Sequence, residues 1–134
     1  MIPSINSILT TDLEVTDIPS KTYKMHIDKN VVRGTCDEVE AVKQSIYKIL
    51  NTERYEYIIY SWNYGIELMD LYGEPVDWVC SELERRITEA LEVDDRIETL
   101  EGFDFDTSEK GVVHVSFTAN TVFGDVEIEK VVNY

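Results

Sequence analysis

Residues that could carry catalysis or bind a metal are few in this chain and poorly spaced for either. The two histidines, His26 and His114, each lie inside a strand-like pattern, and no Gly-x-Ser-x-Gly nucleophile motif accompanies them. Cys36 and Cys80 lie far apart, so neither a disulfide framework nor the close ligand pairs of a zinc site is indicated. The glycines are scattered, unlike those of a phosphate-binding loop. The sequence therefore predicts no catalytic residue, no cofactor and no metal.

Carboxylates are abundant, and two of them at a suitable separation could hydrolyse a glycosidic bond. The 134 residues include 27 acidic and 12 basic side chains, for a formal net charge of −15. With so many acids, chance alone brings pairs together, and Glu56, Glu67, Asp94 and Asp95 are no better placed than many others. Such a charge disfavours nucleic acid and membranes as partners. The negative charge could serve solubility or attract a basic protein partner, and both interpretations stay open.

The element around which the chain is organised is a helix expected over residues 74–91. Its apolar residues recur at the spacing of a helix that buries one stripe: Val76, Val79, Cys80, Leu83, Ile87, Ala90 and Leu91. Charged residues, among them Arg85 and Arg86, fall on the polar face. After Leu91 an acidic corner ends in Arg96, and strand-like sequence begins at Ile97.

The other expected elements give an α+β fold. Strands are expected at residues 23–27 and 31–33, and a capping box at Thr35–Glu38 begins a helix that ends near Asn51. Residues 55–60 favour a strand, and residues 66–72 a short helix. Strands follow at 97–106, with a bulge at Gly102, at 112–119, and at 122–132 after a turn at Asn120-Thr121. The prediction is two main helices packed on a mostly antiparallel sheet with a C-terminal β meander.

The length of 134 residues suits one domain. Irregularly spaced apolar residues and two prolines predict that residues 1–20 are an extended N-terminal arm, followed by a single α+β domain over residues 21–134. No apolar run approaches a membrane span, and the N-terminus does not have the pattern of a secretory signal. We therefore expect a cytoplasmic protein.

An unusual number of aromatic rings falls within one short stretch. The cluster consists of Tyr55, Tyr57, Tyr60, Trp62, Tyr64 and Tyr72. One interpretation is a core plug between the sheet and the helices. The other is a protein-contact surface, because Tyr and Trp are enriched at interface hot spots. Both interpretations stay open.

A fixed order of short motifs runs along the chain. The first helix ends at Ile49-Leu50 and is followed by Thr52-Glu53-Arg54. After a gap to Gly65 comes the second helix, and Arg96-Ile97 then leads into the β meander. This order resembles the baseplate wedge family of contractile phage tails, which includes the sheath-initiator subunits. The chain is similar in length to the XkdS-like subgroup of prophages and phage-tail-like bacteriocins. Some members of the family have carried a lysozyme label.

The resemblance implies a structural subunit of the baseplate that links wedge proteins and initiates sheath assembly. Its partners would be other wedge proteins and the tail sheath subunit, with six copies around the tail tube. It would reside in the host cytoplasm during assembly and then in the virion or tail-like particle. Sheath subunits extend arms that complete a neighbour's sheet, so the resemblance also implies docking by strand addition.

The same resemblance supplies candidate contact residues. The acid–arginine step of the family is matched by Glu53-Arg54, and its Glu-Pro-Arg tripeptide has its counterpart at Asp94-Asp95-Arg96. The aromatic cluster and the terminal strand add further candidates. The full set of predicted partner-binding residues is Glu53, Arg54, Trp62, Tyr64, Asp94, Arg96, Val126 and Ile128.

Two rival functions stay open beside the structural subunit, which is not an enzyme. One is a muralytic, lysozyme-like tail enzyme acting through two carboxylates. The other is an acidic adaptor that binds a basic partner through the Tyr/Trp cluster, which includes Trp62 and Tyr64.

Overall fold

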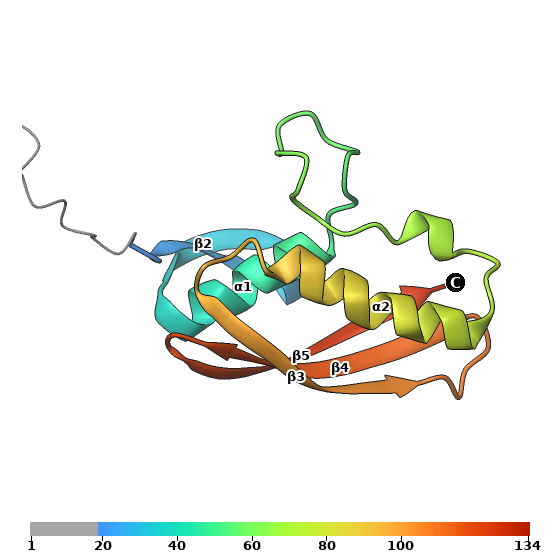
Figure 1. Ribbon diagram of the computed structural model, residues 1–134. Helices are drawn as coiled ribbons and strands as arrows, with labels where there is room; N and C mark the ends of the chain where they lie inside the picture. The colour runs from blue at the N-terminus through green and yellow to red at the C-terminus, as the bar shows by residue number, and fades with distance from the viewer. Residues whose placement is uncertain (1–18) are drawn as a thin grey trace, which may run out of the picture.

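The computed structural model describes residues 19–134, which form two α-helices and two antiparallel sheets (Figure 1). The helices are α1 (Glu38–Leu50) and α2 (Val76–Leu91). The strands are β1 (Thr22–His26), β2 (Val31–Cys36), β3 (Ile97–Asp106), β4 (Val112–Thr121) and β5 (Gly124–Asn133), and the short 3₁₀ helices are η2 (Ile27–Lys29) and η3 (Met69–Leu71). The predicted N-terminal arm, residues 1–20, lies almost wholly outside the described residues. No helix within residues 19–134 is long and apolar enough to cross a membrane.

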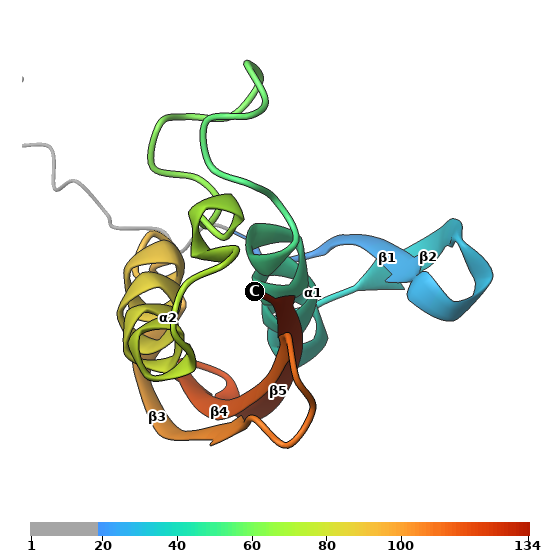
Figure 2. The same ribbon diagram turned by 90° about the vertical axis from the view of Figure 1, so that its right-hand side faces the viewer.

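The main sheet is the C-terminal meander, ordered β3-β4-β5, and both helices cover the same face of it. Figure 2 shows α2 above β3 and α1 above β5. Apolar side chains from the helices and the inner sheet face form one core, which includes Val42, Ile46, Ile49, Leu83, Ile87, Leu91, Val113, Val115, Phe117, Val126 and Ile128. The predicted α+β class, with two helices on an antiparallel sheet and a terminal meander, is confirmed.

The helix starts show one correction to the sequence prediction. Helix α1 begins after Asp37, whose carboxylate accepts a hydrogen bond from the backbone N–H of Glu38 at 2.8 Å. The predicted capping box is therefore wrong, because Thr35 pairs with Tyr23 in the β1–β2 hairpin. Helix α2 ends at Leu91, as its apolar stripe predicts.

The meander differs from the prediction only at one turn. Strands β4 and β5 pair without a register shift over their full length of 10 residues each. Asn120 and Thr121 therefore belong to β4, and the turn lies at Val122-Phe123. The predicted bulge in β3 is confirmed: Gly102 has a φ of +67°, and the pairing with β4 shifts beside it.

Strands β1 and β2 form a separate hairpin that extends away beside α1 (Figure 2). Gln44 of α1 satisfies backbone groups of β1 as a neighbouring strand would. Its amide Nε2 donates to the carbonyl of Tyr23 at 2.7 Å, and its Oε1 accepts from the N–H of Met25 at 2.9 Å. One side chain thereby fixes the hairpin to the helix.

The connection between α1 and α2 departs most from the prediction. Residues 55–60, which were expected to be extended, contain turns and no strand. Residues 66–72, which were expected to make two helical turns, contain only η3. Long-range hydrogen bonds from α2 and within the connection itself shape this segment, so local propensity does not decide its structure.

Candidate functional site

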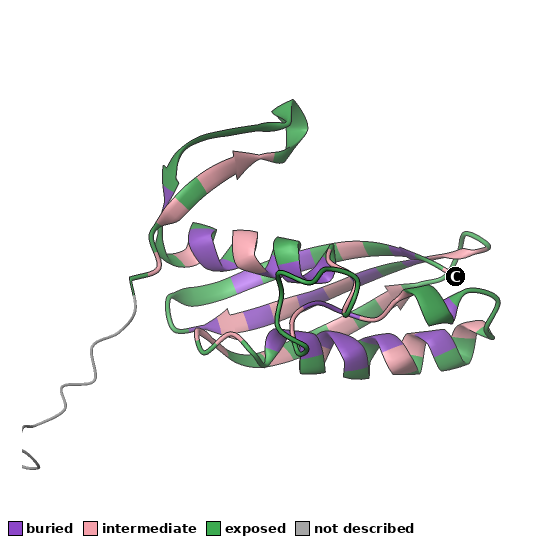
Figure 3. Ribbon diagram, turned by 90° about the horizontal axis from the view of Figure 1, so that it is seen from above, coloured by how far each residue is buried: buried purple, intermediate pink, exposed green. Residues whose placement is uncertain are grey.

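Residues 55–64 form a loop, here called the aromatic loop, that projects from the helical side of the domain away from the sheet (Figures 1 and 2). Figure 3 shows that the loop is exposed over most of its length. Ile58 is fully exposed, Ile59 is 85% exposed and Trp62 is 84% exposed. The predicted core plug is therefore wrong, although Tyr64 does pack against the core. The predicted contact surface stays a prediction.

Aromatic contacts order the loop internally. The rings of Tyr60 and Tyr64 stack with centroids 4.4 Å apart. Edge-to-face contacts join Tyr55 to Trp62 at 5.9 Å and Tyr57 to Tyr60 at 6.2 Å. Pairs of this kind contribute about 0.5–1.5 kcal/mol beyond their burial. The loop therefore keeps a defined shape while its rings remain accessible.

Backbone hydrogen bonds close the base of the loop. The N–H of Ile66 donates to the carbonyl of Thr52 at 3.0 Å, and the N–H of Arg54 donates to the carbonyl of Ile66 at 3.1 Å. Glycine is required at position 65, because a Cβ there would lie 2.5 Å from the Thr52 carbonyl oxygen and φ is +94°. The segment that enters the loop, residues 52–54, therefore lies against the segment that leaves it, residues 65–66.

Glu53 and Arg54, both predicted partner-binding residues, hold this base from within the molecule. The carboxylate of Glu53 accepts from the N–H of Leu68 at 3.0 and 3.1 Å, next to the start of η3. Arg54 donates from Nε to the carbonyl of Gly65 and from Nη1 to Glu89 of α2, both at 3.3 Å. Their observed role is to position the loop, and a contact with a partner stays a prediction.

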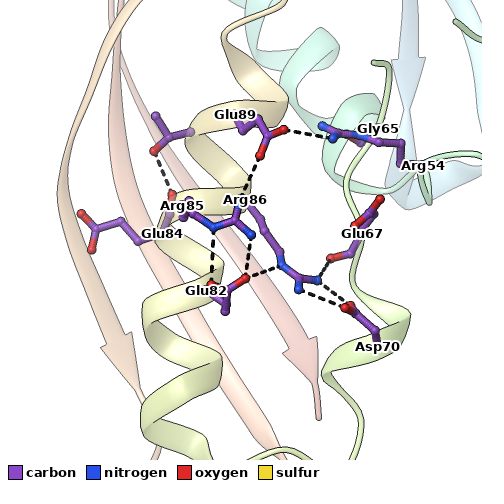
Figure 4. Close-up of polar contacts among 10 residues, drawn as sticks. Arg54, Gly65, Glu67, Asp70, Glu82, Glu84, Arg85, Arg86 and Glu89 are labelled. Carbon is purple, nitrogen blue, oxygen red and sulfur yellow. Dashed lines mark hydrogen bonds and ion pairs between the residues drawn. The ribbon is translucent and has the colours of Figure 1, made fainter. Parts of the chain in front are cut away.

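Arg86 of α2 joins the helix to the segment that follows the loop (Figure 4). Only 9% of this residue is exposed. Its guanidinium donates to the carbonyl of Glu67 at 2.7 Å, to both carboxylate oxygens of Asp70, and to Glu82 at 3.0 Å. It also lies 5.9 Å from the ring centroid of Trp78. Arg86 lies on the polar face of α2 and pairs with Glu82 at the i, i+4 spacing, but it is buried there because residues 67–70 cover it.

The arginines change the acidity of the carboxylates around them. Hydrogen bonding from Arg86 lowers the pKa of Asp70, and hydrogen bonds from Arg85 and then Arg86 lower the pKa of Glu82. These acids are ionised at neutral pH and belong to one chain of ion pairs from the loop base to η3, which runs Arg54, Glu89, Arg85, Glu82, Arg86, Asp70 (Figure 4).

A second candidate lies in the turn between α2 and β3, at the corner formed by Asp94 and Arg96. Arg96 donates to the Asp94 carboxylate from Nε at 2.9 Å and from Nη2 at 2.7 Å, and the Ser45 hydroxyl of α1 donates at 3.0 Å. Burial alone would raise the pKa of Asp94, but these hydrogen bonds, chiefly from Arg96, hold it below its ordinary value. Arg96 and Tyr64 line the same small recess, so the corner and the loop base meet there.

The remaining predicted contact residues lie in β5, away from the loop and the corner. Val126 and Ile128 are buried against the helices. They alternate with Asp125, Glu127 and Glu129, which are exposed on the opposite face of the sheet. The backbone N–H and C=O groups of Val126 and Ile128 face β4, because every second residue of β5 bonds to that strand, in the same alternation as the bond from the Tyr134 N–H to the Gly111 carbonyl. The outer edge of β5 instead presents the backbone groups of Asp125, Glu127 and Glu129. A partner contact at Val126 and Ile128 stays a prediction.

Comparison with known proteins identifies the family. The family model for the contractile injection system sheath initiator matches residues 8–124. The chain belongs to this family. The phage-like element PBSX protein XkdS of Bacillus subtilis (strain 168) is 38% identical over 137 residues, which cover 92% of this chain and 96% of that protein. The predicted resemblance to sheath initiators of the XkdS-like kind is confirmed, and the chain is a structural component of a phage tail or tail-like particle.

The sheath-initiator match includes the aromatic loop, the corner and most of the meander. Two important residues of this sheath initiator were missed by sequence reasoning, Gln44 and Arg86. A signal existed for Arg86: Trp78, Glu82 and Arg86 follow at four-residue intervals and share one helical face. A tryptophan on that face indicates a covering segment. We find no comparable signal for Gln44.

Proposed function

We propose that this sheath initiator links wedge proteins in the baseplate and starts sheath assembly by accepting a strand from a sheath subunit. The observation that carries the proposal is the outer edge of β5. The strand order β3-β4-β5 leaves β5 without a strand on its outer side among residues 19–134. An edge strand presents unpaired N–H and C=O groups, and an incoming strand satisfies them.

Two features favour β5 over β3 as the docking edge. Strand β3 bulges at Gly102, and a bulge interrupts the regular backbone pattern that an added strand needs. Strand β5 keeps one register with β4 throughout. Its exposed acids, Asp125, Glu127 and Glu129, disfavour pairing with a second copy and favour a strand with basic residues.

The corner is the proposed contact with neighbouring wedge proteins. Arg96 donates hydrogen bonds from Nε and Nη2 to the Asp94 carboxylate, and its side chain remains 28% exposed. Its remaining N–H groups could donate to a carbonyl or carboxylate of a partner. Six copies around the tail tube, and assembly in the host cytoplasm before incorporation, complete the proposal.

The muralytic alternative finds no supporting observation at the candidate site. The carboxylates there accept hydrogen bonds from fixed partners: Glu53 from backbone N–H groups, Asp70 and Glu82 from Arg86, and Asp94 from Arg96. The pKa values of Asp70, Glu82 and Asp94 are lowered, whereas a general acid needs a raised value. Membership in the sheath-initiator family also favours a structural role over a muralytic one.

Charge reversal tests the docking edge. The test variant carries Asp125→Lys, Glu127→Lys and Glu129→Lys in β5, and the control carries Glu98→Lys, Glu101→Lys and Asp104→Lys in β3. Both change the net charge equally at exposed positions. Electron microscopy of particles from a producing strain should show baseplate-bearing tubes without sheath for the β5 variant and sheathed particles for the control. Normal sheaths on the β5 variant, or loss of sheath in the β3 variant alone, would refute the proposed edge.

A further inference from the structure

We infer that the aromatic loop is a docking element that inserts its apolar tip into a recess on a different protein of the particle, with basic groups around that recess. The loop exposes more apolar surface than a connector needs. Ile58, Ile59 and Trp62 lie almost entirely in solvent. Contiguous large apolar side chains on a protein surface mark contact sites.

The loop is held in one shape before any partner arrives. The two ends of the loop are joined by the isolated β-bridge between Glu53 and Ile66, and three aromatic pairs order the rings within the loop. The hydroxyl of Ser61 also donates to the side-chain oxygen of Asn63 at 2.7 Å. A loop ordered in advance loses little conformational entropy on binding, so its exposed rings can contribute fully to affinity.

Two largely buried arginines hold the loop and the segment after it against α2. Arg54, whose side chain is 12% exposed, ties the loop base to α2, and Arg86 ties the following segment to the same helix. Long connections with internal order are typically functional, since a direct link between two elements needs few residues. The connection from residue 51 to residue 68 is far longer than such a link.

Charge determines which kind of partner fits. Residues 55–64 contain one charged side chain, Glu56, and no basic residue. A second copy of this chain, with a net charge of −15, would be repelled. The partner is therefore a different protein, with an apolar recess for Ile58, Ile59 and Trp62 and with lysine or arginine near Glu56. Tyr and Trp side chains are the usual anchors of such contacts.

The placement of this partner in the particle rests on the proposed function, whereas the docking role of the loop rests on its exposure and order. Site-specific photo-crosslinking tests both parts in the assembled particle. The full chain carries p-benzoylphenylalanine at Ile59 in a producing strain, with Tyr72 as the control position, because Tyr72 is 62% exposed and lies outside the loop. Position 59 should crosslink to one other particle protein, at a peptide with apolar and basic residues. A crosslink to a second copy, or particles that contain the chain with no crosslink at position 59, would overturn the inference.

A substitution gives the second measurement. The double variant Ile58→Ser, Ile59→Ser should fold normally, with an unchanged urea midpoint, because both side chains are exposed. Its amount in purified particles should fall at least about tenfold, as for the loss of an interface hot spot, while Tyr72→Ser enters normally. Normal incorporation of the double variant would refute the docking role and leave the proposed function intact. Absence of the unsubstituted chain from purified particles would overturn both.

Discussion

Replacing Arg86 by methionine tests how the segment after the aromatic loop is held. Methionine keeps most of the apolar length but loses the hydrogen bonds to Glu67, Asp70 and Glu82. The bond to the Glu67 carbonyl has a charged donor, and such bonds contribute about 1.5–3 kcal/mol. The carboxylate of Asp70, 58% exposed, regains water when released, so its pair adds about 0.5–1 kcal/mol. The free energy of unfolding should therefore fall by about 2–4 kcal/mol.

Urea denaturation measures this loss, and Arg85→Met is the matched control. Arg85 is adjacent on α2 and also pairs with two carboxylates, but its side chain is 59% exposed. Its replacement should leave the urea midpoint unchanged within error. Hydrogen exchange should show faster exchange in residues 65–72 for the Arg86 variant alone. Equal effects of the two substitutions would refute the account of Arg86.

The pH dependence gives an independent check on the same residue. The pKa values of Asp70 and Glu82 are lowered in the folded state, mainly by hydrogen bonds from the arginines. Their stabilising contribution is therefore present at neutral pH and is lost as the pH falls through those lowered values. The difference between Arg86→Met and the unsubstituted chain should shrink as the pH falls below the ordinary pKa values of these two carboxyls and through their lowered ones. A constant difference would contradict this assignment.

Three further substitutions test other parts of the structure. Gly65→Ala should lower the free energy of unfolding by about 3 kcal/mol or more, because the new Cβ meets the Thr52 carbonyl and φ is positive; an unchanged melting temperature would contradict this close contact at the loop base. Leu83→Ala, at a fully buried position, should cost about 2–5 kcal/mol in urea denaturation, and a value near zero would exclude Leu83 from the core. Arg96→Met should raise the pKa of Asp94 from its lowered value, because the guanidinium is lost while burial remains, opposed only by the Ser45 hydroxyl and the backbone N–H of residue 96. The contribution of this ion pair in the unsubstituted chain is present at neutral pH and is lost as the pH falls through the lowered pKa, so the stability difference between the two chains should shrink as the pH falls through that value; parallel stability curves would contradict the ion pair.

The helices and the meander could be predicted because their patterns are local. The apolar stripe that ends at Leu91 has the period of a helix, and Val113, Val115 and Phe117 have the period of a strand with one buried face. Neither pattern depends on a distant part of the chain. The bulge at Gly102 could likewise be predicted from a single residue type.

The aromatic loop could not be predicted, because distant groups determine its shape. Residues 55–60 have strand-like composition, yet Gly65 and Ile66 return to the end of α1 and close a loop instead. Arg86 lies on what a helical projection shows as a polar face, and only the covering segment makes it buried. In both cases the deciding contact is tertiary, and propensity or periodicity carries no information about it.

Cryo-electron microscopy of the assembled particle tests the central claim most directly. We expect this chain at the junction of baseplate and sheath, with a strand from a sheath subunit paired along the outer edge of β5. A particle in which the chain is absent from that junction, or in which the outer edge of β5 is bare while the sheath is attached elsewhere, would contradict the account.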